Sequence, residues 1–357
     1  MESMKPKKIA VGMSGGVDSS VCALLLQESG YQVSGITMLL HGGCDDEQGC
    51  GTTSDIEDAK AVCERLGIPL HVCDQRKGFE KQVIERFSKS YELAETPNPC
   101  ILCNRYMKFD AMLEESLALG LDGIATGHYA RVEYDEKSGR YLLKKALDES
   151  KDQSYVLYSL TQHQLSHTLF PLGNLEKTKV REIAEKKELK NAHKKESQDI
   201  CFVPDGDYAG FIRRYRGITF PEGNFVDKNG KILGKHKGII HYTIGQRKGL
   251  GLSFPCPMYV ISKDLATNTV VLGPIDELYQ STFTATDINL ISVDKIEGEM
   301  QVAAKIRYNQ KEQPATVTQI DENTIQVTFT EPQKAITKGQ AVVLYDQDTV
   351  VGGGTIM

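Results

Sequence analysis

Two groups of residues in this 357-residue chain could do chemistry: a glycine- and serine-rich loop near the N-terminus and three cysteines farther along. The loop, Gly12 to Ser20 with the sequence GMSGGVDSS, follows an apolar run and precedes a helical pattern. Glycines let a backbone turn sharply and approach a ligand closely, and the unpaired N–H groups of a helix N-terminus favour an anion. The loop therefore predicts a phosphate site, with an ordinary strand-to-helix turn as the alternative.

This loop differs from the two commonest phosphate loops. It lacks the spacing and the lysine of a Walker A motif, and it is not a G-x-G-x-x-G fingerprint. Ser14 and Ser19 offer hydroxyl donors, whereas the Asp18 carboxylate would repel a phosphate unless a cation such as Mg²⁺ lies between them. We therefore expect a nucleotide site in which Asp18 acts together with a divalent cation.

Cys100 and Cys103 form a C-x-x-C pair in the segment TPNPCILCN, and Cys201 lies far along the chain in ESQDICF. Two prolines stiffen the turn before Cys100, and a helix N-terminus beside Cys103 is expected to lower the pKa of its thiol. Half of a zinc site and a thioredoxin-like motif are the alternatives. A structural zinc usually takes four ligands, however, and the sequence has no second pair of this spacing. We therefore expect a nucleophilic thiolate at Cys103.

Strands and helices alternate over the first two hundred residues, which is typical of βαβ units around a parallel sheet. Apolar runs predict strands at 8–13, 32–40, 68–73 and 122–126, and helical periods predict helices at 19–28, 55–66, 79–91 and 104–119. A hairpin pairing 130–134 with 141–146 and an amphipathic helix at 177–189 are expected to follow. The glycine loop would then join the first strand to the first helix.

The pattern changes after Pro204-Asp205-Gly206, where short strands are punctuated by glycine and proline and helical periods are few. Alternating runs at 301–308, 315–320, 324–329 and 341–345 predict a small antiparallel barrel. The expected fold is α/β, with a Rossmann-like parallel-sheet N-terminal domain followed by two smaller β-rich domains. The boundaries are 1–205 for the catalytic domain, 206–282 for a central β-rich domain and 283–357 for a C-terminal antiparallel β-barrel domain.

The charge balance at first argues against a nucleic-acid partner, because 42 basic and 48 acidic residues give a net charge of −6. The charges are uneven, however. Residues 177–195 hold eight basic and three acidic residues, and residues 231–251 hold five basic and no acidic ones. Such runs are usually only solvated faces, but two of them beside the expected chemistry favour an RNA partner.

The sequence contains no apolar stretch of membrane-spanning length and no signal-peptide pattern. We therefore expect a cytoplasmic protein that does not enter the membrane. Its thiols are then expected to be mostly reduced.

The motif SGGVDS resembles the pyrophosphate loop of the ATP pyrophosphatases (the PP-loop family), which cleave ATP between the α and β phosphates and adenylate a carbonyl oxygen. Over nearly its whole length the chain is similar to the bacterial and mitochondrial tRNA-specific 2-thiouridylases. The motifs that carry this likeness are ATGHYAR at 125–131, KDQSYVLY at 151–158, ESQDICF around Cys201, HYTIGQRKGLG at 241–251, KIRYNQ at 305–310 and KGQAVVLYD at 338–346. The resemblance implies an adenine nucleotide hydrolase-like fold and ATP-dependent thiolation of the wobble uridine of tRNA at C2.

The same resemblance implies roles for individual residues. ATP and Mg²⁺ would be bound through Gly12, Met13, Ser14, Gly15, Gly16, Val17, Asp18, Ser19, Met38 and Gly127, with Asp18 also catalytic. Cys103 would be the nucleophile, and Cys201 would carry a persulfide and form a transient disulfide with Cys103. The target base would meet Asn98, Pro99 and Cys100. The anticodon arm of tRNA would be bound by His128, Lys151, Asp152, Gln153, Arg307, Tyr308 and Gln340. A cysteine desulfurase or a persulfide relay protein would supply the sulfur.

The chain departs from the family at Cys100, where the more familiar pattern has Asp, and this puts a carboxylate role there in doubt. Cys100, Cys103 and Cys201 could instead hold a [4Fe-4S] cluster with one open iron, or Cys100 could be merely a small loop residue. His128 has a satisfied core histidine as its alternative, and tyrosines such as Tyr308 are more often packed than stacked on bases.

The other cysteines carry less information. Cys22, Cys63 and Cys73 fall on apolar faces and are expected in the core. Cys44 and Cys50 flank an acidic loop that would be either a surface loop or a metal site, and Cys256 lies between two prolines without an assigned role.

Two other functions compete with the one that the resemblance implies. One is an adenylating enzyme with the same loop that acts on a small metabolite. The other is a non-catalytic module that binds ATP.

Overall fold

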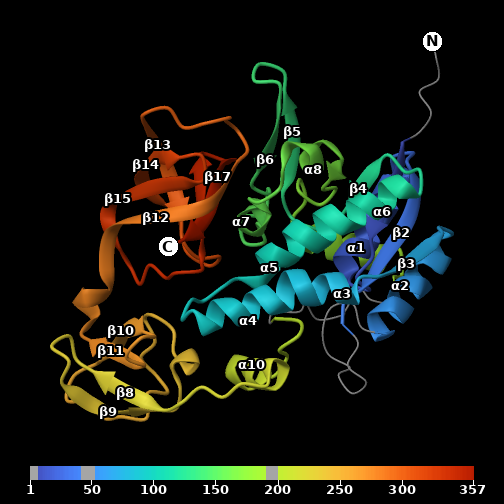
Figure 1. Ribbon diagram of the computed structural model, residues 1–357. Coiled ribbons are helices and arrows are strands. Elements are labelled where there is room, and N and C mark those ends of the chain that lie inside the picture. Colours follow the sequence, from blue (N-terminus) through green and yellow to red (C-terminus); the bar gives the residue numbers. More distant parts are fainter. Residues whose placement is uncertain (1–6, 42–52, 190–199) are drawn as a thin grey trace.

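The computed structural model describes residues 7–41, 53–189 and 200–357. These residues form a parallel sheet with helices, a four-stranded sheet and a large antiparallel sheet, and the three parts lie side by side in Figure 1. The N-terminal part is blue to green, the middle part yellow to orange, and the C-terminal part orange to red. No helix among the described residues is long and apolar enough to span a membrane.

The N-terminal sheet is parallel, as the alternation of strands and helices predicts. Its order is β3 (Leu70–Asp74), β2 (Gln32–Leu39), β1 (Lys8–Gly12), β4 (Gly123–Ala125) and β7 (Thr168–Leu169). Successive residues of β1 point to opposite faces. Ile9 and Val11 pack with α1 (Val17–Glu28) and α2 (Thr53–Leu66), whereas Ala10 packs on the other face with Phe109, Met112 and Leu113. The sheet is therefore covered on both faces, and the predicted α/β class is confirmed.

Two long helices run from the sheet toward the other domains. The first consists of α3 (Arg76–Phe79), a π-helical segment η1 (Glu80–Ile84) and α4 (Glu85–Glu92). The second consists of α5 (Pro99–Leu102), a π-helical segment η2 (Cys103–Ala111) and α6 (Met112–Ala118), and we call it the cysteine helix. It begins five residues before the predicted start at 104, because Asn98 caps it and Pro99 occupies its first turn.

Short helices and a hairpin complete the N-terminal part. The helices are α7 (Ser154–Leu157), α8 (Gln162–Ser166) and α9 (Lys177–Lys186), the last shorter than the predicted 177–189. The predicted hairpin is present as β5 (Arg131–Asp135) and β6 (Arg140–Lys144), which pair with Arg131 opposite Lys144.

The C-terminal part is an antiparallel barrel of six strands in the order β12-β15-β14-β13-β16-β17, closed by pairing between β12 and β17. The strands are β12 (Tyr279–Leu290), β13 (Glu299–Lys305), β14 (Gln313–Asp321), β15 (Thr324–Lys334), β16 (Ala341–Asp346) and β17 (Thr349–Ile356). Thr349 also pairs with Lys144, which joins the N-terminal hairpin to the barrel sheet. The sequence pattern predicted the hairpin and the barrel but not their union.

The middle part contains a sheet in the order β10 (Tyr259–Asp264), β11 (Thr269–Gly273), β8 (Gly223–Val226) and β9 (Ile232–His236). Short 3-10 helices, η3 (Ile239–His241) and η4 (Ile275–Leu278), flank it. The sheet is preceded by α10 (Tyr208–Arg216), a helix that the sequence analysis missed. Its signals are an aspartate cap at Asp207, whose side chain accepts from the Gly210 N–H, and a left-handed Gly217 at its end.

Candidate active site

The glycine loop leaves the end of β1 and turns into α1 at the centre of the parallel sheet. The Met13 N–H donates to the Ile36 carbonyl at 2.7 Å, and the Ser14 N–H donates to the Ser19 hydroxyl at 3.3 Å. The hydroxyl of Ser19 in turn donates to the Gly16 carbonyl at 3.0 Å. These bonds fix the turn, and Gly16 caps α1 without any side-chain oxygen on its first N–H groups. The N-terminus of α1 therefore presents donors suited to an anion.

Glycines are required on two sides of this loop. Gly15 has a φ of +70°, and a Cβ there would lie 2.9 Å from the Asp55 carbonyl oxygen. A Cβ on Gly127, at the end of β4, would lie 2.8 Å from the Asp18 carbonyl carbon. The structure thus brings Gly127 against the glycine loop, as expected of two segments that bind one nucleotide.

Asp18 has two side-chain partners that its place in the loop did not reveal. The Lys177 ammonium lies 2.8 Å from both carboxylate oxygens, and the Tyr129 hydroxyl donates to one of them at 2.9 Å. The Lys177 side chain is only 9% exposed, whereas that of Asp18 is 28% exposed. A protein cation therefore already faces the carboxylate for which we expected a divalent cation. In the sequence, Lys177 stands out only as part of a basic run.

The start of the cysteine helix is fixed by Asn98, whose side-chain oxygen accepts from the Cys100 N–H at 3.1 Å. Cys100 is exposed and Cys103 is partly buried. Farther along, the buried Asn104 amide donates to the Val156 carbonyl at 3.1 Å. Because the helix starts at Pro99, Cys103 lies one turn inside it rather than beside its N-terminus, which corrects the local geometry expected from the sequence.

The segment that carries Cys201 is anchored on the first long helix, α3 to α4, by aromatic packing. Phe202, the neighbour of Cys201, packs edge-on against Phe87, with ring centroids 5.2 Å apart, and against Phe79 at 5.7 Å. Cys201 and Cys103 both pack on this hydrophobic cluster, which spans the N-terminal helices, α10 and the middle sheet. Two cysteines far apart in sequence are therefore brought to one packed region.

The remaining cysteines divide as the apolar pattern predicts. Cys22, Cys63 and Cys73 are buried. Burial raises the pKa of Cys22 far above its usual value and raises the pKa of Cys63 and Cys73 to about 11, so these thiols stay protonated near neutral pH. Cys256 is exposed, and Cys44 and Cys50 lie outside the described residues.

The three thiols proposed for a cluster do not form a metal site in this geometry. Within residues 7–41, 53–189 and 200–357, no group of three or more His, Cys, Asp or Glu side chains is placed to hold a metal ion. Cys100, Cys103 and Cys201 therefore do not present three converging thiolates, and we derive no chemistry from an iron–sulfur cluster.

The expected RNA contacts in the N-terminal part fall into two kinds. His128 is buried between Phe109 and Phe170, 2.7 Å from the Thr126 hydroxyl, and burial holds its pKa well below the ordinary value. This geometry matches the alternative of a satisfied core histidine rather than a side chain that faces RNA. The segment 151–153 instead leads into α7, and the Gln153 side chain accepts from the Tyr129 N–H at 2.9 Å.

The expected RNA contacts on the barrel reach across to the N-terminal part. The Tyr308 hydroxyl donates to the Asp152 carbonyl at 3.2 Å, and the Gln340 amide donates to the Thr96 carbonyl at 2.6 Å. Arg307 donates within the barrel, to the Ala335 carbonyl. Tyr308 and Gln340 therefore lie at the junction of the barrel with the N-terminal domain.

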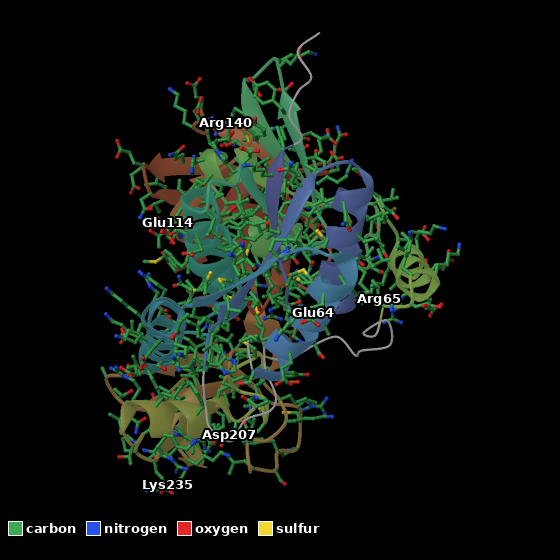
Figure 2. All side chains as sticks on the ribbon, turned by 90° about the vertical axis from the view of Figure 1, so that its right-hand side faces the viewer. Glu64, Arg65, Glu114, Arg140, Asp207 and Lys235 are labelled. Atoms are coloured by element: carbon green, nitrogen blue, oxygen red, sulfur yellow. The ribbon has the colours of Figure 1, made fainter. Side chains whose placement is uncertain are left out.

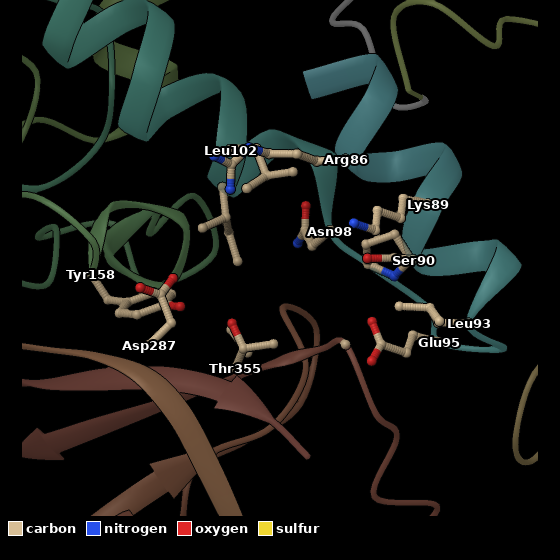
Figure 3. A pocket seen from close by; sticks show the side chains of 14 residues that line it. Arg86, Lys89, Ser90, Leu93, Glu95, Asn98, Leu102, Tyr158, Asp287 and Thr355 are labelled. Atoms are coloured by element: carbon tan, nitrogen blue, oxygen red, sulfur yellow. The ribbon is translucent and has the colours of Figure 1, made fainter. Parts of the chain in front are cut away.

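A pocket of about 260 Å³ lies at this junction (Figure 3). Arg86 and Lys89 of α4 line one side, Asn98 lies at the start of the cysteine helix, and Asp287 and Thr355 of the barrel line the other side. The pocket thus borders the predicted base contact Asn98 from the side of the barrel. Its walls carry both cations and anions, and Asp287 is paired with Arg105 at 2.5 Å.

Comparison with known proteins covers all three parts of the chain. Residues 7–205 match the family model described as the tRNA methyl transferase HUP domain, residues 209–274 the tRNA methyl transferase PRC-barrel domain, and residues 280–356 the aminomethyltransferase beta-barrel domain.

Curated relatives match over nearly their full length. The chain is 51% identical to the tRNA-specific 2-thiouridylase MnmA of Clostridioides difficile, with 98% of each chain covered. It is 51% identical to the protein of the same name from Acetivibrio thermocellus, with 99% of this chain and 100% of that one covered. Among solved structures, a 4-thiouridine synthetase–RNA complex with bound ATP matches 56% of this chain and 46% of its own, at 17% identity and a TM-score of 0.37.

Proposed function

The chain belongs to the family of tRNA-specific 2-thiouridylases, and we propose that it uses ATP to replace the C2 oxygen of the wobble uridine of tRNA by sulfur. The observation that carries this proposal is the combination of two features in one chain. A glycine loop suited to phosphate lies at the end of β1, and Cys103 and Cys201 share one packed cluster beside the sheet. A small-metabolite adenylating enzyme would have no use for the two cysteines.

Adenylation comes first, because the C2 carbonyl of uridine is a poor electrophile and its oxygen is a poor leaving group. The segment from Gly12 to Ser19, with Met38 and Gly127, would bind ATP, and the C2 oxygen would attack the α-phosphorus and release pyrophosphate. A Mg²⁺ held mainly by substrate phosphates would neutralise phosphate charge, with the Asp18 carboxylate shared between this ion and Lys177. Lys177 keeps the Asp18 carboxylate in place beside the loop.

Sulfur transfer follows and balances without an external electron acceptor. The terminal sulfur of a Cys201 persulfide attacks C2, and the C–O bond to AMP breaks. The Cys103 thiolate then attacks the Cys201 sulfur. A Cys103–Cys201 disulfide forms, the S–S bond to the nucleoside breaks, and the sulfur stays on C2 as the thiocarbonyl. An external thiol must reduce the disulfide before the next turnover.

The wobble base must leave its stack to reach this site. We propose that Asn98, Pro99 and Cys100 meet the flipped base, and that Lys151, Asp152, Gln153, Arg307, Tyr308 and Gln340 bind the anticodon arm. The junction of barrel and catalytic domain, where Tyr308 and Gln340 lie, supports this assignment.

The sulfur reaches Cys201 from a partner. We propose a cysteine desulfurase or a persulfide relay protein as the donor, and the cytoplasm, where tRNA and ATP occur together, as the place of the reaction.

The proposal is tested by incubating the protein with ATP, Mg²⁺, a persulfide source and unmodified tRNA, followed by mass spectrometry of the nucleosides. We expect 2-thiouridine and one AMP per modified base, and no 2-thiouridine from Cys103→Ser or Cys201→Ser. AMP formation with a small acceptor and no change in tRNA would favour the metabolite enzyme. ATP binding without pyrophosphate release would favour the non-catalytic module.

A further inference from the structure

The segment just before the cysteine helix is held by the barrel. The Thr96 N–H donates to the Lys338 carbonyl at 2.9 Å, and the Thr96 carbonyl accepts from the Gln340 side-chain amide at 2.6 Å. Both polar groups of the Thr96 backbone are therefore paired with one turn of the barrel, between β15 and β16. We call residues 338–340 the barrel turn.

The barrel turn packs against this segment so closely that its middle residue must be glycine. Gly339 has a φ of +86°, and a Cβ there would lie 2.9 Å from the Glu95 Cβ and 3.0 Å from the Thr96 nitrogen. The backbone conformation and the lack of space both exclude a larger residue. The close contact between the barrel turn and Thr96 therefore depends on a glycine at position 339.

A charged residue of the middle domain interacts with Glu95, in the segment just before the cysteine helix. Lys263 of β10, in the middle domain, has a buried ammonium without a hydrogen-bond partner among the described residues, and Glu95 is the acid that acts on its charge. Glu95 and Asn98 also line the junction pocket, opposite Thr355 of the barrel (Figure 3). Glu95 thus faces the barrel across the pocket and acts on a buried cation of the middle domain.

We propose that the barrel turn positions the start of the cysteine helix, and that Gln340 is a positioning residue for the chemistry of Cys103. The path is short, since Thr96 is two residues from Asn98, whose side chain caps the helix at Cys100, and Cys103 follows one turn later. Displacing reacting atoms by about 1 Å can cost about a hundredfold in rate. The inference rests on the proposed function and gives Gln340 a task besides binding RNA.

The test compares Gln340→Glu and Gln340→Met, which both lose the amide donor, with Gln326→Glu as the matched control. Gln326 is exposed on β15 of the same barrel. We expect both Gln340 variants to lower kcat for tRNA thiolation about tenfold or more, in addition to any rise in KM for tRNA from the lost RNA contact. In the RNA-free protein we expect faster hydrogen exchange in the peptide 94–103 and unchanged exchange in the barrel strands. The control should match the wild type in both measurements.

Two results would overturn the proposal. A raised KM with unchanged kcat would make Gln340 an RNA contact alone, and unchanged exchange in the peptide 94–103 would show that the barrel turn does not hold this segment. The neutral Gln340→Met keeps the test valid if the charged variant does not fold. The exchange measurement needs neither tRNA nor ATP. A chain that fails to thiolate tRNA would therefore refute the proposed function, and the exchange would still show whether the barrel turn holds the segment before the cysteine helix.

Discussion

Asp18 and Lys177 show what local sequence can and cannot reveal about single residues. The glycine loop could be predicted, because its function depends on residues that are adjacent in the chain. The partner of the Asp18 carboxylate could not be predicted. Lys177 lies 159 residues away, in a basic run of the kind that is usually exposed to solvent. The same limit applies to His128, whose buried environment is built by Phe109 and Phe170. Spacing thus predicted which segments matter, and tertiary packing decided how their side chains are paired.

The Asp18–Lys177 pair should contribute measurably to stability. Lys177→Met leaves a partly buried carboxylate without its cation, and we expect a loss of about 2 kcal/mol in the free energy of unfolding. A fully buried pair would lose about 3–5 kcal/mol, but the Asp18 side chain keeps 28% of its exposure. Urea denaturation at pH 7 measures the change. Asp18→Asn combined with Lys177→Met should recover part of the loss, and additive losses in the double variant would contradict direct coupling.

At the scale of elements, the strands and helices of the N-terminal domain could be predicted because each carries its own apolar period. The cysteine helix was predicted to begin at 104 because two prolines precede it. The structure shows that Asn98 and Pro99 start the helix instead of blocking it. The missed α10 has only nine residues, follows directly after the turn residues Pro204-Asp205-Gly206, and buries Ala209 and Ile212 in a cluster shared with the N-terminal helices. Elements that are stabilised mainly by other domains are those that single-sequence reasoning describes least well.

Lys263 on β10 gives this interdomain packing a pH signature. Burial lowers its pKa from 10.5 to about 8, against the opposing effect of Glu95. Below pH 8 both states carry the proton, and the folded state bears the full cost of a buried ammonium. Between pH 8 and 10.5 the unfolded chain binds more protons, so stability rises with pH in this window.

We therefore expect Lys263→Met to be more stable than the wild type by about 2–3 kcal/mol at pH 7, and the difference to shrink as the pH approaches 10. Urea denaturation of both proteins at pH 7 and pH 10 measures this change. A difference that is the same at both pH values would show that the methionine acts through packing alone.

At the scale of the whole molecule, the domains are joined by contacts that no sequence pattern announces. Arg131 of β5 pairs with Asp348 at 2.7 Å, and Lys145 pairs with Glu312 at 2.7 Å. With the pairing of Thr349 and Lys144, these contacts fix the barrel on the catalytic domain. Each partner lies more than 160 residues from the other in the chain. The existence of a barrel follows from local alternation, whereas its docking follows from shape and charge that only the folded domains possess.

The net charge of −6 also hides a distribution that matters only in the folded molecule. In the middle domain, the five basic residues of the segment 231–251 are all exposed and therefore available to phosphates: Lys231, Lys235, Lys237, Arg247 and Lys248. The other basic segment, 177–195, falls partly outside the described residues, which include neither Lys194 nor Lys195. Figure 2 shows Lys235 near one end of the molecule and Arg140 of the hairpin near the other. The middle domain and the hairpin tip therefore provide separate places to test where RNA binds.

If tRNA lies along the middle domain, its binding must release counterions. The logarithm of the affinity should then fall linearly with the logarithm of salt concentration, by about 0.7–0.9 for each phosphate neutralised. Lys248→Glu should weaken tRNA binding and reduce this slope by about one, whereas the same substitution at exposed Lys137, in the hairpin tip, should change neither. Filter binding between roughly 50 and 200 mM salt measures both quantities. Equal effects of the two reversals would show that the protein senses only its total charge, and an affinity independent of salt would remove phosphate contacts as the basis of binding.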